Sequence, residues 1–456
     1  MSRGLGDVYK RQSSGSISLA GEYDLGRLWL SLFRSSAKEY DDPIAKSYVR
    51  DFMYRISETS EVRDRRYEFI ILDDASINAF AAPGGIIGIN TGMFIKTETE
   101  GQFASVMCHE LAHLSQRHYA RSQQNNNPLT NALILLGSVA TAVVTANPQA
   151  ILIAPALIQQ LATNYTRENE READRIGFRN LVNAGFDPRS QSQMFQILQK
   201  SQSGINEEYS YLFTHPIPKE RITDARIREE NIDNQSNYRN SLEFYLVKAR
   251  AEVANSKNLS SLKEFYLSKQ KNNDNKIKLY KKYGLSLVLK EQKKYEESFK
   301  AARELLKEIP SNLIFQTNIL EIHLAEGNSL EAISIGERLL NVNSNNFSIS
   351  YYLAKAYILD NNPEKAEEIL INLSKENPRD PTVWYELAEA QGLAGNIIGL
   401  HRSRAEYFIL TGRYDSAIFQ LREGLKLSKN FFEIRESIIN KLEQIYKTKR
   451  ALKDLT

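Results

Sequence analysis

His109-Glu110-Leu111-Ala112-His113 is the stretch that decides the fold of the first half of this 456-residue chain. On an α-helix, residues four positions apart lie on one face, so both imidazoles can bind the same metal ion. Zinc takes imidazole nitrogen as a ligand and, in catalytic sites, keeps one position for water. Glu110 is placed to accept a proton from that water as a general base. The motif therefore predicts a zinc-peptidase helix.

A second, acidic helix is predicted downstream, where the site needs a third ligand. The segment Tyr165–Gly177 carries Glu170 and Asp174 four positions apart, and therefore on one face. One carboxylate can bind zinc while the other holds a ligand histidine in the tautomer that binds metal. The competing interpretation is a solvated helix face, because arginines are interleaved with the acids. Alone, the segment favours the solvated face; with the upstream motif, it favours the metal site.

Two further residues near the motif are interpreted as structural. On a continuous helix, His118 lies about 180° around the axis from His109 and so points away from the metal. Gln116 and Tyr119 stand where a metzincin has glycine and a third histidine. A ligand set of two histidines and one glutamate is therefore favoured. Cys108, the single cysteine, is predicted to be a buried thiol.

The composition is that of an ordinary globular protein. Hydrophobic residues make up 42% of the chain and charged residues 25%. The formal net charge of +3 is too small, and the basic residues too interleaved with acids, to indicate nucleic-acid binding. Residues 1–12 lack the apolar core of a signal peptide. Residues 1–15 are expected to be an unstructured or extraneous start.

The polar stretch Ile232–Asn240 divides the chain into two domains of different character. A zinc-peptidase domain is predicted at 16–235, and an all-helical repeat domain at 236–456. The expected fold class is therefore mostly α with a small β-sheet, followed by an all-α solenoid.

The first domain is predicted to contain both helices and strands. Apolar periodicity indicates helix over 22–57 and over 100–121, the second of which carries the zinc motif. Tyr67–Asp73 is rich in β-branched and aromatic residues and predicts a strand. Within Ile77–Asn90, the pair Gly84-Gly85 predicts a turn into a second short strand.

An uncharged segment interrupts the first domain. Residues 122–166 contain no charged side chain, and two apolar runs, Leu133–Ala146 and Ala150–Ala162, flank Asn147-Pro148. Each run is shorter than the roughly 20 residues that cross a bilayer. Two interpretations stay open. The segment is either a helical hairpin buried against the peptidase, or a lip over 129–162 that contacts a membrane surface or an unfolded substrate.

The second domain repeats with a period of 34 residues. Alanines recur at this spacing in the pairs Ala332 and Ala366, Ala354 and Ala388, and Ala356 and Ala390. This is the tetratricopeptide period, with small residues where two helices approach closely. Such solenoids present a binding surface, although a scaffold without a dedicated ligand is the alternative. Gly412–Ala417 is out of register, which predicts an inserted or irregular helix around Ile397–Leu410.

Together these motifs resemble the M48 metallopeptidases over nearly the whole chain, residues 1–15 excepted. The segments that carry the resemblance are Ile77–Phe80, Ala104–Glu110, Glu172–Gly177, Gly185–Pro188, Thr214–Pro216 and the repeats. The resemblance implies a zinc endopeptidase with one zinc ion per chain. His109, His113 and Glu170 are the implied ligands, Glu110 the implied catalytic base, and Asp174 the acid that holds a ligand histidine.

The resemblance also gives roles to residues further from the motif. It implies that His215 is either a fourth metal ligand that keeps the enzyme latent or a donor to the developing oxyanion. A capping or core histidine is the alternative. Arg221 matches a family arginine near the substrate. The strand after Gly84-Gly85 is expected to pair with the substrate backbone, and Asn78-Ala79-Phe80 are expected to form a substrate strand.

Substrates and compartment follow from the same resemblance. The expected substrates are unfolded or misassembled outer-membrane β-barrel proteins in the bacterial periplasm, and the expected role is partly chaperone-like. The repeats are expected to dock the substrate or the β-barrel assembly machinery. Since such proteins are exported, the chain is expected to lack its natural start. Two alternatives stay open: a repeat-domain chaperone or adaptor of barrel assembly with a latent zinc site, and a zinc hydrolase of non-protein substrates.

Overall fold

The computed structural model describes residues 18–122, 166–202, 215–216, 219–232, 238, 240–269 and 274–453. The expectations for residues 1–15 and for the lip over 129–162 fall outside these residues. The chain divides into two compact units. The N-terminal unit comprises Met1–Tyr40, Val49–Ser241 and Tyr446–Thr456, and the repeat unit comprises Asp41–Tyr48 and Leu242–Ile445. The main division thus lies a few residues after the predicted one, and two short segments group with the other unit.

A three-stranded sheet forms the centre of the N-terminal unit. Its strands are β1 (Glu68–Leu72), β2 (Ala79–Ala82) and β3 (Ile86–Asn90). β3 lies in the middle, parallel to β1 and antiparallel to β2. In the turn between β2 and β3, Gly84 and Gly85 have φ angles of 76° and 78°, which side chains disfavour. The predicted glycine turn is confirmed.

Helices complete the N-terminal unit. They are α2 (Leu19–Arg34), α3 (Pro43–Ser57), α4 (Thr91–Lys96), α5 (Glu100–Ser115), α6 (His118–Ser122), α9 (Arg167–Asn183), α10 (Arg189–Gln202) and α12 (Lys219–Glu230). The helical pattern expected over 22–57 is confirmed, and it consists of two separate helices, α2 and α3. Proline disfavours helical backbone in the residue before it, so α3 begins anew at Pro43.

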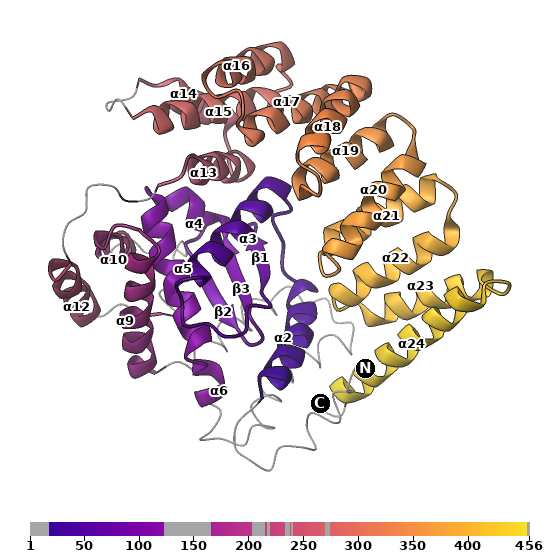
Figure 1. Cartoon of the computed structure of the whole chain (residues 1–456), viewed down its shortest axis with the longest axis horizontal. Coiled ribbons are helices and arrows are strands. Elements are labelled where there is room, and N and C mark those ends of the chain that lie inside the picture. The colour runs from indigo at the N-terminus through magenta and orange to yellow at the C-terminus, as the bar shows by residue number, and fades with distance from the viewer. Residues whose placement is uncertain are drawn as a thin grey trace. The chain divides into compact units, whose positions relative to one another are not determined.

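Helix α5 carries the zinc motif and is buried all round. Every residue from Glu100 to His113 is buried, and α5 packs against β2, α9 and α10 (Figure 1). A Cβ on Gly177 of α9 would lie 3.0 Å from backbone atoms of His109, so glycine permits the close approach of α9 to the motif. The predicted helix over 100–121 ends early, at Ser115, because Arg117 has a left-handed φ of 50°.

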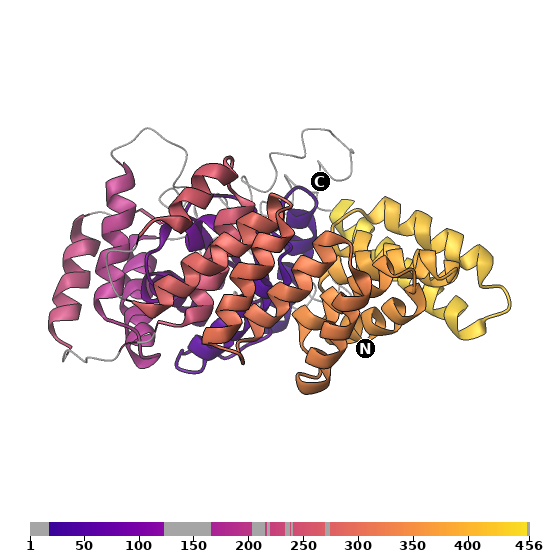
Figure 2. The same ribbon diagram turned by 90° about the horizontal axis from the view of Figure 1, so that it is seen from above.

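The repeat unit is entirely helical in its described part, and Figure 2 shows its helices following one another side by side. They are α13 (Leu242–Ala254), α14 (Leu259–Leu267), α15 (Asn275–Glu291), α16 (Tyr295–Glu308), α17 (Leu313–Glu326), α18 (Ser329–Val342), α19 (Phe347–Leu359), α20 (Pro363–Glu376), α21 (Pro381–Leu393), α22 (Ile397–Leu410), α23 (Tyr414–Leu427) and α24 (Phe432–Lys453). The first residues of α17, α19 and α21 are Leu313, Phe347 and Pro381, so the predicted period of 34 is confirmed.

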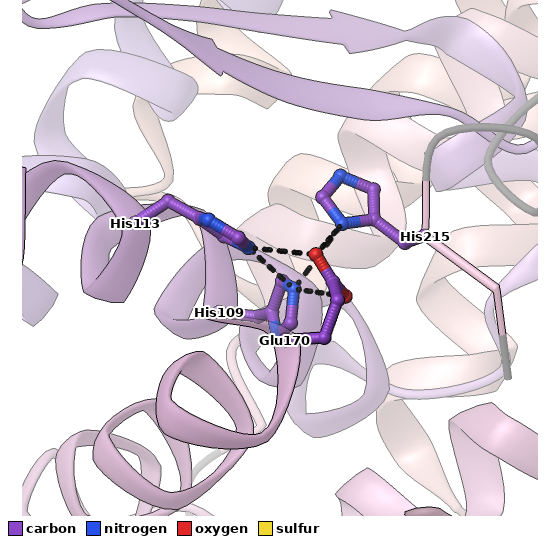
Figure 3. A group of neighbouring side chains, drawn as sticks. All are labelled: His109, His113, Glu170 and His215. Carbon is purple, nitrogen blue, oxygen red and sulfur yellow. Dashed lines mark hydrogen bonds and ion pairs between the residues drawn. The ribbon is translucent and has the colours of Figure 1, made fainter. Parts of the chain in front are cut away.

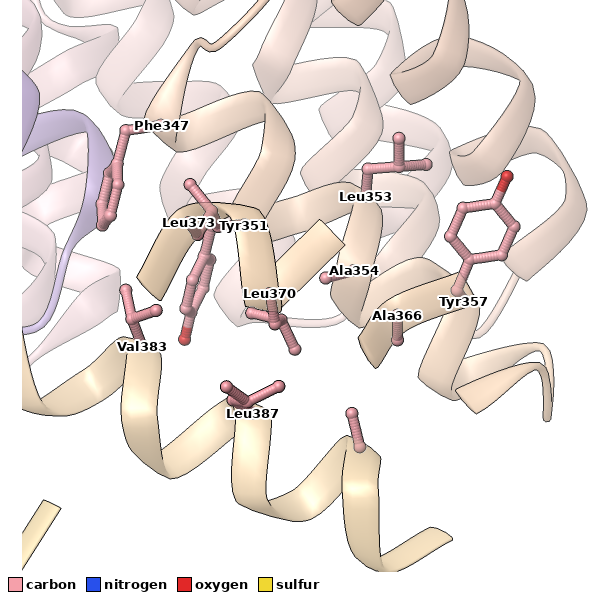
Figure 4. Close-up of a cluster of buried hydrophobic side chains, with 11 residues drawn as sticks. Phe347, Tyr351, Leu353, Ala354, Tyr357, Ala366, Leu370, Leu373, Val383 and Leu387 are labelled. Atoms are coloured by element: carbon pink, nitrogen blue, oxygen red, sulfur yellow. The ribbon is translucent and has the colours of Figure 1, made fainter. Parts of the chain in front are cut away.

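The repeats are held together by apolar contacts between successive helices. Figure 4 shows one such cluster, in which Ala354 and Ala366 are buried where helices meet. Ala390 of α21 belongs to the same buried cluster. The helix predicted around Ile397–Leu410 exists as α22 and packs against both α21 and α23. The fold class expected from the sequence is confirmed. No helix in the described ranges combines the length and the apolar character that crossing a membrane requires.

Candidate metal centre

Four side chains from three parts of the N-terminal unit meet at one point. His109 and His113 come from α5 and Glu170 from α9, whereas His215 lies in neither a helix nor a strand. All four are buried, and one donor atom from each lies within 4.8 Å of the others. Figure 3 shows the side chains pointing toward one another. The helical spacing thus brings both motif histidines to one place.

The distances between the donor atoms suit a tetrahedral metal ion. Nε2 of His109 lies 3.0 Å from Nε2 of His113 and 3.4 Å from Nδ1 of His215. Oε1 of Glu170 lies 3.3 Å from Nε2 of His113 and 2.9 Å from Nδ1 of His215. Zinc with ligands at roughly 2.0–2.1 Å holds tetrahedral donors about 3.3 Å apart. The donor set therefore has the dimensions and chemistry of a zinc site.

The charges in this cluster also suit a divalent cation. Glu110, Glu170 and Asp174 contribute three carboxylates and Arg221 one guanidinium, and all four side chains are buried. With neutral histidines, two negative charges stay uncompensated within this set. Burying uncompensated charge is strongly unfavourable. A divalent cation between the four donors balances the set, so these residues fit zinc in charge as well as in geometry.

Asp174 lies against the first histidine of the motif. Its Oδ1 is 3.1 Å from Nδ1 of His109, so the ring donates there and turns its Nε2 lone pair toward the cluster. Burial lowers the pKa of His109, but hydrogen bonds with Asp174 and Glu170 outweigh burial and raise this pKa to about 10. The carboxylates therefore favour an imidazole whose Nδ1 keeps its proton.

Arg221 joins the two acids of α9. Its Nε and Nη2 donate to the two oxygens of Asp174 over 2.7 and 2.8 Å, and its Nη1 lies 2.8 Å from Oε2 of Glu170. Nη1 also donates to the carbonyl of Pro216, next to His215. Burial raises the pKa of Asp174, but the charge of Arg221 and the hydrogen bonds from His109 and Arg221 together outweigh burial and lower this pKa. The guanidinium, expected near the substrate, is 2% exposed and contacts the carboxylates of the site.

Glu110 lies beside the four donors and is fully buried. Its Oε1 is 3.5 Å from Nε2 of His215. Burial raises the pKa of Glu110, while the charges of His215 and His109 act in the opposite direction. A carboxylate with a raised pKa next to a metal-binding cluster suits a general base.

Comparison with known proteins identifies the family. Residues 43–229 match the model of peptidase family M48, and residues 323–390 match a tetratricopeptide repeat. The chain is 32% identical over 416 residues to the beta-barrel assembly-enhancing protease of Escherichia coli K12, covering 89% of this chain and 84% of that protein. The protein of the same name in Yersinia pestis is 29% identical, covering 90% of this chain and 85% of its own. The chain belongs to peptidase family M48.

A more distant relative matches less than half of this chain. A mitochondrial metalloendopeptidase of Schizosaccharomyces pombe is 26% identical over 220 residues, which cover 45% of this chain and 64% of that protein. Family M48 and these relatives make the chain a zinc metalloendopeptidase, as its sequence predicts. The cluster of His109, His113, Glu170 and His215 could hold that metal ion.

One contact of this M48 site was not anticipated from the sequence. His118, expected to point away from the metal, lies with Nδ1 2.9 Å from Nδ1 of His113. It contributes no donor atom to the metal cluster among the described residues. His118 is thus outside the donor set, as expected, but it contacts His113 because α5 ends at Ser115 and the chain turns there. Cys108 is buried as predicted, and burial raises the pKa of its thiol.

A cleft of about 500 Å³ borders the zinc site. Ala81–Gly85, at the end of β2 and in the turn after it, line one side, and His113–Arg117 line another. Because β2 pairs with β3 alone, its other edge is available within the sheet. The cleft therefore joins the end of β2 to His113, one member of the cluster.

The sheet order corrects one expectation about the substrate strand. The strand after Gly84-Gly85 is β3, which is paired on both sides and cannot accept a further strand. Asn78, Ala79 and Phe80 instead lie at or on β2, the edge strand, and all are buried. The ring of Phe80 packs edge-on against Trp29 and Phe33, with centroids 5.9 and 5.6 Å away. The ring of Phe80 is thus packed inside the N-terminal unit.

Proposed function

We propose that this zinc endopeptidase cleaves unfolded or misassembled outer-membrane β-barrel proteins in the bacterial periplasm, with a chaperone-like contribution from its repeats. The cluster of His109, His113, Glu170 and His215 around the buried Glu110 carries the proposal of proteolysis. The substrate class is supported by the name of the relatives, beta-barrel assembly-enhancing protease. An edge strand beside the zinc site also suits extended barrel segments.

In this proposal His109, His113 and Glu170 hold the zinc ion. When bound, zinc supplies a polarised water molecule and polarises the scissile carbonyl. Glu110 accepts the proton of the attacking water and then donates a proton to the leaving amide nitrogen. Its place beside the four donors supports this exchange, because a general base must lie within reach of the water it deprotonates.

Asp174 and Arg221 act on the ligands rather than on the substrate. Asp174 keeps the Nδ1 proton of His109 in place, and Arg221 holds Asp174 and Glu170 side by side on α9. The bond from Arg221 to the carbonyl of Pro216 ties this pair to the backbone next to His215. We assign Arg221 to positioning, because its guanidinium is buried and faces the two carboxylates.

His215 acts in this proposal as a latch. With its Nδ1 among the four donors, the cluster has the complete protein ligand set of a closed zinc site. A substrate then reaches the zinc only after His215 leaves. Its Nε2 also lies near Glu110, so the same residue can serve as a donor to the oxyanion once it has moved.

The substrate backbone is proposed to pair with the edge of β2 that lies opposite β3. Alternate residues of a strand point their backbone groups to the same edge. The N–H of Asn90 in β3 donates to the carbonyl of Asn78, so the backbone groups of Ala79 and Ala81 face the edge of β2 opposite β3. Pairing there places a scissile bond of the substrate beside Glu110 and the zinc ligands.

The first test is cleavage of an unfolded outer-membrane barrel protein by the zinc-loaded chain and by its Glu110→Gln variant. We expect the variant to keep its zinc and to lose about 10²–10⁴-fold in cleavage rate, the usual contribution of a general base. Glu168→Gln, which changes an exposed acid on α9, is the matched control and should cleave at the wild-type rate. Equal cleavage by the Glu110→Gln variant would remove Glu110 from the mechanism.

The second candidate function is a repeat-based chaperone or adaptor of barrel assembly with a latent zinc site. The four-donor set favours it, because a closed site has no position for water. In cells, a Glu110→Gln variant that still supports barrel assembly would favour the adaptor over the protease. A zinc hydrolase of non-protein substrates is disfavoured if the purified chain cleaves any unfolded polypeptide.

A further inference from the structure

The two histidines of the HExxH motif are held in different ways. His109 donates from Nδ1 to a carboxylate, that of Asp174, over 3.1 Å. The Nδ1 of His113 instead lies 2.9 Å from Nδ1 of another imidazole, that of His118. His118 is fully buried, and the two rings are nearly perpendicular, with centroids 4.9 Å apart. The Nδ1 of His113 therefore has a neutral imidazole as its partner, that of His118, rather than a carboxylate.

A sharp turn of the backbone brings His118 to this place. Helix α5 ends at Ser115, and Arg117 adopts a left-handed conformation with φ of 50° before α6 begins at His118. Left-handed backbone is unfavourable for residues other than glycine. Here the guanidinium of Arg117 bonds to Oε1 of Glu22 over 2.7 and 3.1 Å, which holds the turn. The turn sends His118 back toward His113 instead of away from it.

One assignment of protons satisfies this chain of side chains. If Nε2 of His113 binds metal, its proton is on Nδ1, which then donates to Nδ1 of His118. His118 consequently carries its own proton on Nε2, which lies 3.1 Å from Oε2 of Glu172. The same oxygen accepts from Nη1 of Arg121 over 2.8 Å. Each ring thus fixes the tautomer of the one before it.

We propose that His118, supported by Glu172 and Arg121, is a positioning residue that fixes the tautomer and ring orientation of the metal ligand His113. This inference rests on the proposed zinc ligand set. His118 is absent from the lining of the cleft, although its neighbours Arg117 and Tyr119 belong to it. It therefore acts on the ligand and not on the substrate. Groups that hold a ligand histidine typically contribute 10–100-fold to metal affinity.

The test is the zinc affinity of purified full-length variants, measured by competition with a chelator. His118→Phe removes the acceptor for His113, so zinc affinity should fall by about 10–100-fold. His118→Asn places an amide oxygen near the former Nδ1 position and should recover most of that loss. The cobalt-substituted proteins should show the same order in the intensity of their visible absorption, which reports ligand geometry directly.

Two further variants separate positioning from folding. Phe103→Leu changes a buried core residue of the same helix α5, which stacks on Phe94 away from the ligands, and should destabilise the fold without changing zinc affinity. Glu172→Leu removes the acceptor for His118 from a side chain that is 28% exposed, so folding should tolerate it. We expect its zinc affinity to fall by up to about tenfold, toward the lower end of the range for such partners.

The outcomes distinguish this inference from the proposed zinc site itself. Wild-type zinc affinity in both His118→Phe and Glu172→Leu would overturn the role of His118 and leave the zinc site standing. If neither the wild-type protein nor the control binds zinc tightly, the ligand set fails, and the role of His118 fails with it. Loss of affinity in the two variants, recovery in His118→Asn and no change in Phe103→Leu would establish the role.

Discussion

Two buried clusters of charged side chains, one in each unit, differ in a way that separates structure from function. In the repeat unit, Arg250 donates to Asp42, to both oxygens of Glu321 and to the hydroxyls of Tyr283 and Tyr352. Lys290 adds a second cation, 2.9 Å from Glu321. Two acids therefore face two bases. In the N-terminal unit, three carboxylates face a single guanidinium, and four metal-binding atoms face one another.

The comparison teaches how to interpret buried charge in this chain. Around Arg250 the protein supplies every partner, so the cluster serves the fold alone. Around His109 and Glu170 the protein leaves two negative charges for something else to balance, so the cluster marks a binding site. The two clusters should therefore respond differently to metal and to acid.

The largest effect is expected from changing the acid that binds zinc. Glu170→Gln removes the charge from the only acid in the four-donor set, so zinc affinity should fall by more than about 100-fold, beyond the loss caused by an outer partner. Proteolysis should disappear with the metal. Glu172→Gln, on the same helix, keeps an oxygen for His118 and should retain zinc. Metal analysis of the two purified proteins decides the matter, and the reverse pattern would mean that Glu172 is the ligand.

A large effect on folding is expected in the repeat unit. Arg250→Met leaves Asp42 and Glu321 facing each other without their guanidinium, which should destabilise the fold by about 3–5 kcal/mol. Adding zinc should not change this loss. Arg221→Met in the N-terminal unit also strands two acids, Glu170 and Asp174, but bound zinc should offset part of its loss. Urea unfolding, with zinc and with chelator, measures the loss of stability in each variant. If zinc changed the stability of the two variants equally, the difference between the two clusters would be contradicted.

Acid should weaken the repeat cluster over a defined range of pH. Burial raises the pKa of Glu321, but the charges of Arg250 and Lys290 outweigh it and lower this pKa to about 2. A carboxyl with a lowered pKa stabilises the fold above its unfolded pKa, near 4.3, and loses that contribution as the pH falls toward 2. The contribution at neutral pH is roughly 3 kcal/mol, at 1.36 kcal/mol per pKa unit.

The variant Glu321→Gln tests this range. It should be less stable than the wild type at pH 7, and the difference should shrink between about pH 4.3 and pH 2. Glu368→Gln, at an exposed acid of α20, is the control and should follow the wild type at every pH. A difference between Glu321→Gln and the wild type that stays constant down to pH 2 would contradict the assignment of the lowered pKa to Glu321.

Much of the architecture could be predicted because it depends on periodic or local signals. The zinc helix, the strand at Tyr67–Asp73, the glycine turn and the 34-residue period are each written in consecutive residues. The order of the strands in the sheet could not be predicted in this way. The segment Ala79–Ala82 is too short, and its side chains mostly too small, to identify an edge strand, and strand pairing depends on distant residues. The grouping of Asp41–Tyr48 with the repeats likewise depends on contacts far along the chain, such as Asp42 with Arg250.

The residues of the site also divide into those that local spacing predicts and those that distant contacts place. His109, Glu110, His113, Glu170 and Asp174 were found because helical spacing places them on defined faces. The contact of His118 with His113 could not be predicted by this spacing rule, because the rule holds only within a helix and α5 ends at Ser115. No glycine marks the left-handed turn at Arg117, and the bond from Glu22 that holds it comes from 95 residues away. Tertiary contacts of this kind leave no trace in local sequence.

The smallest of the expected effects concerns His215, the residue that most distinguishes the metal-binding cluster from the cluster around Arg250. Every partner of Arg250 named above lies in or beside a helix. His215 and Pro216 instead lie in neither a helix nor a strand. His215 can therefore move away from the other donors without unfolding a helix or strand of its own. If the latched state outweighs the open one about tenfold, His215→Ala should raise basal proteolysis by about the same factor. Zinc binding should persist through His109, His113 and Glu170. Cleavage of an unfolded barrel protein under zinc saturation measures the change. A fall of about 10²–10³-fold with zinc retained would instead make His215 a donor to the oxyanion, and the cluster would then be an assembled catalytic site rather than a closed one.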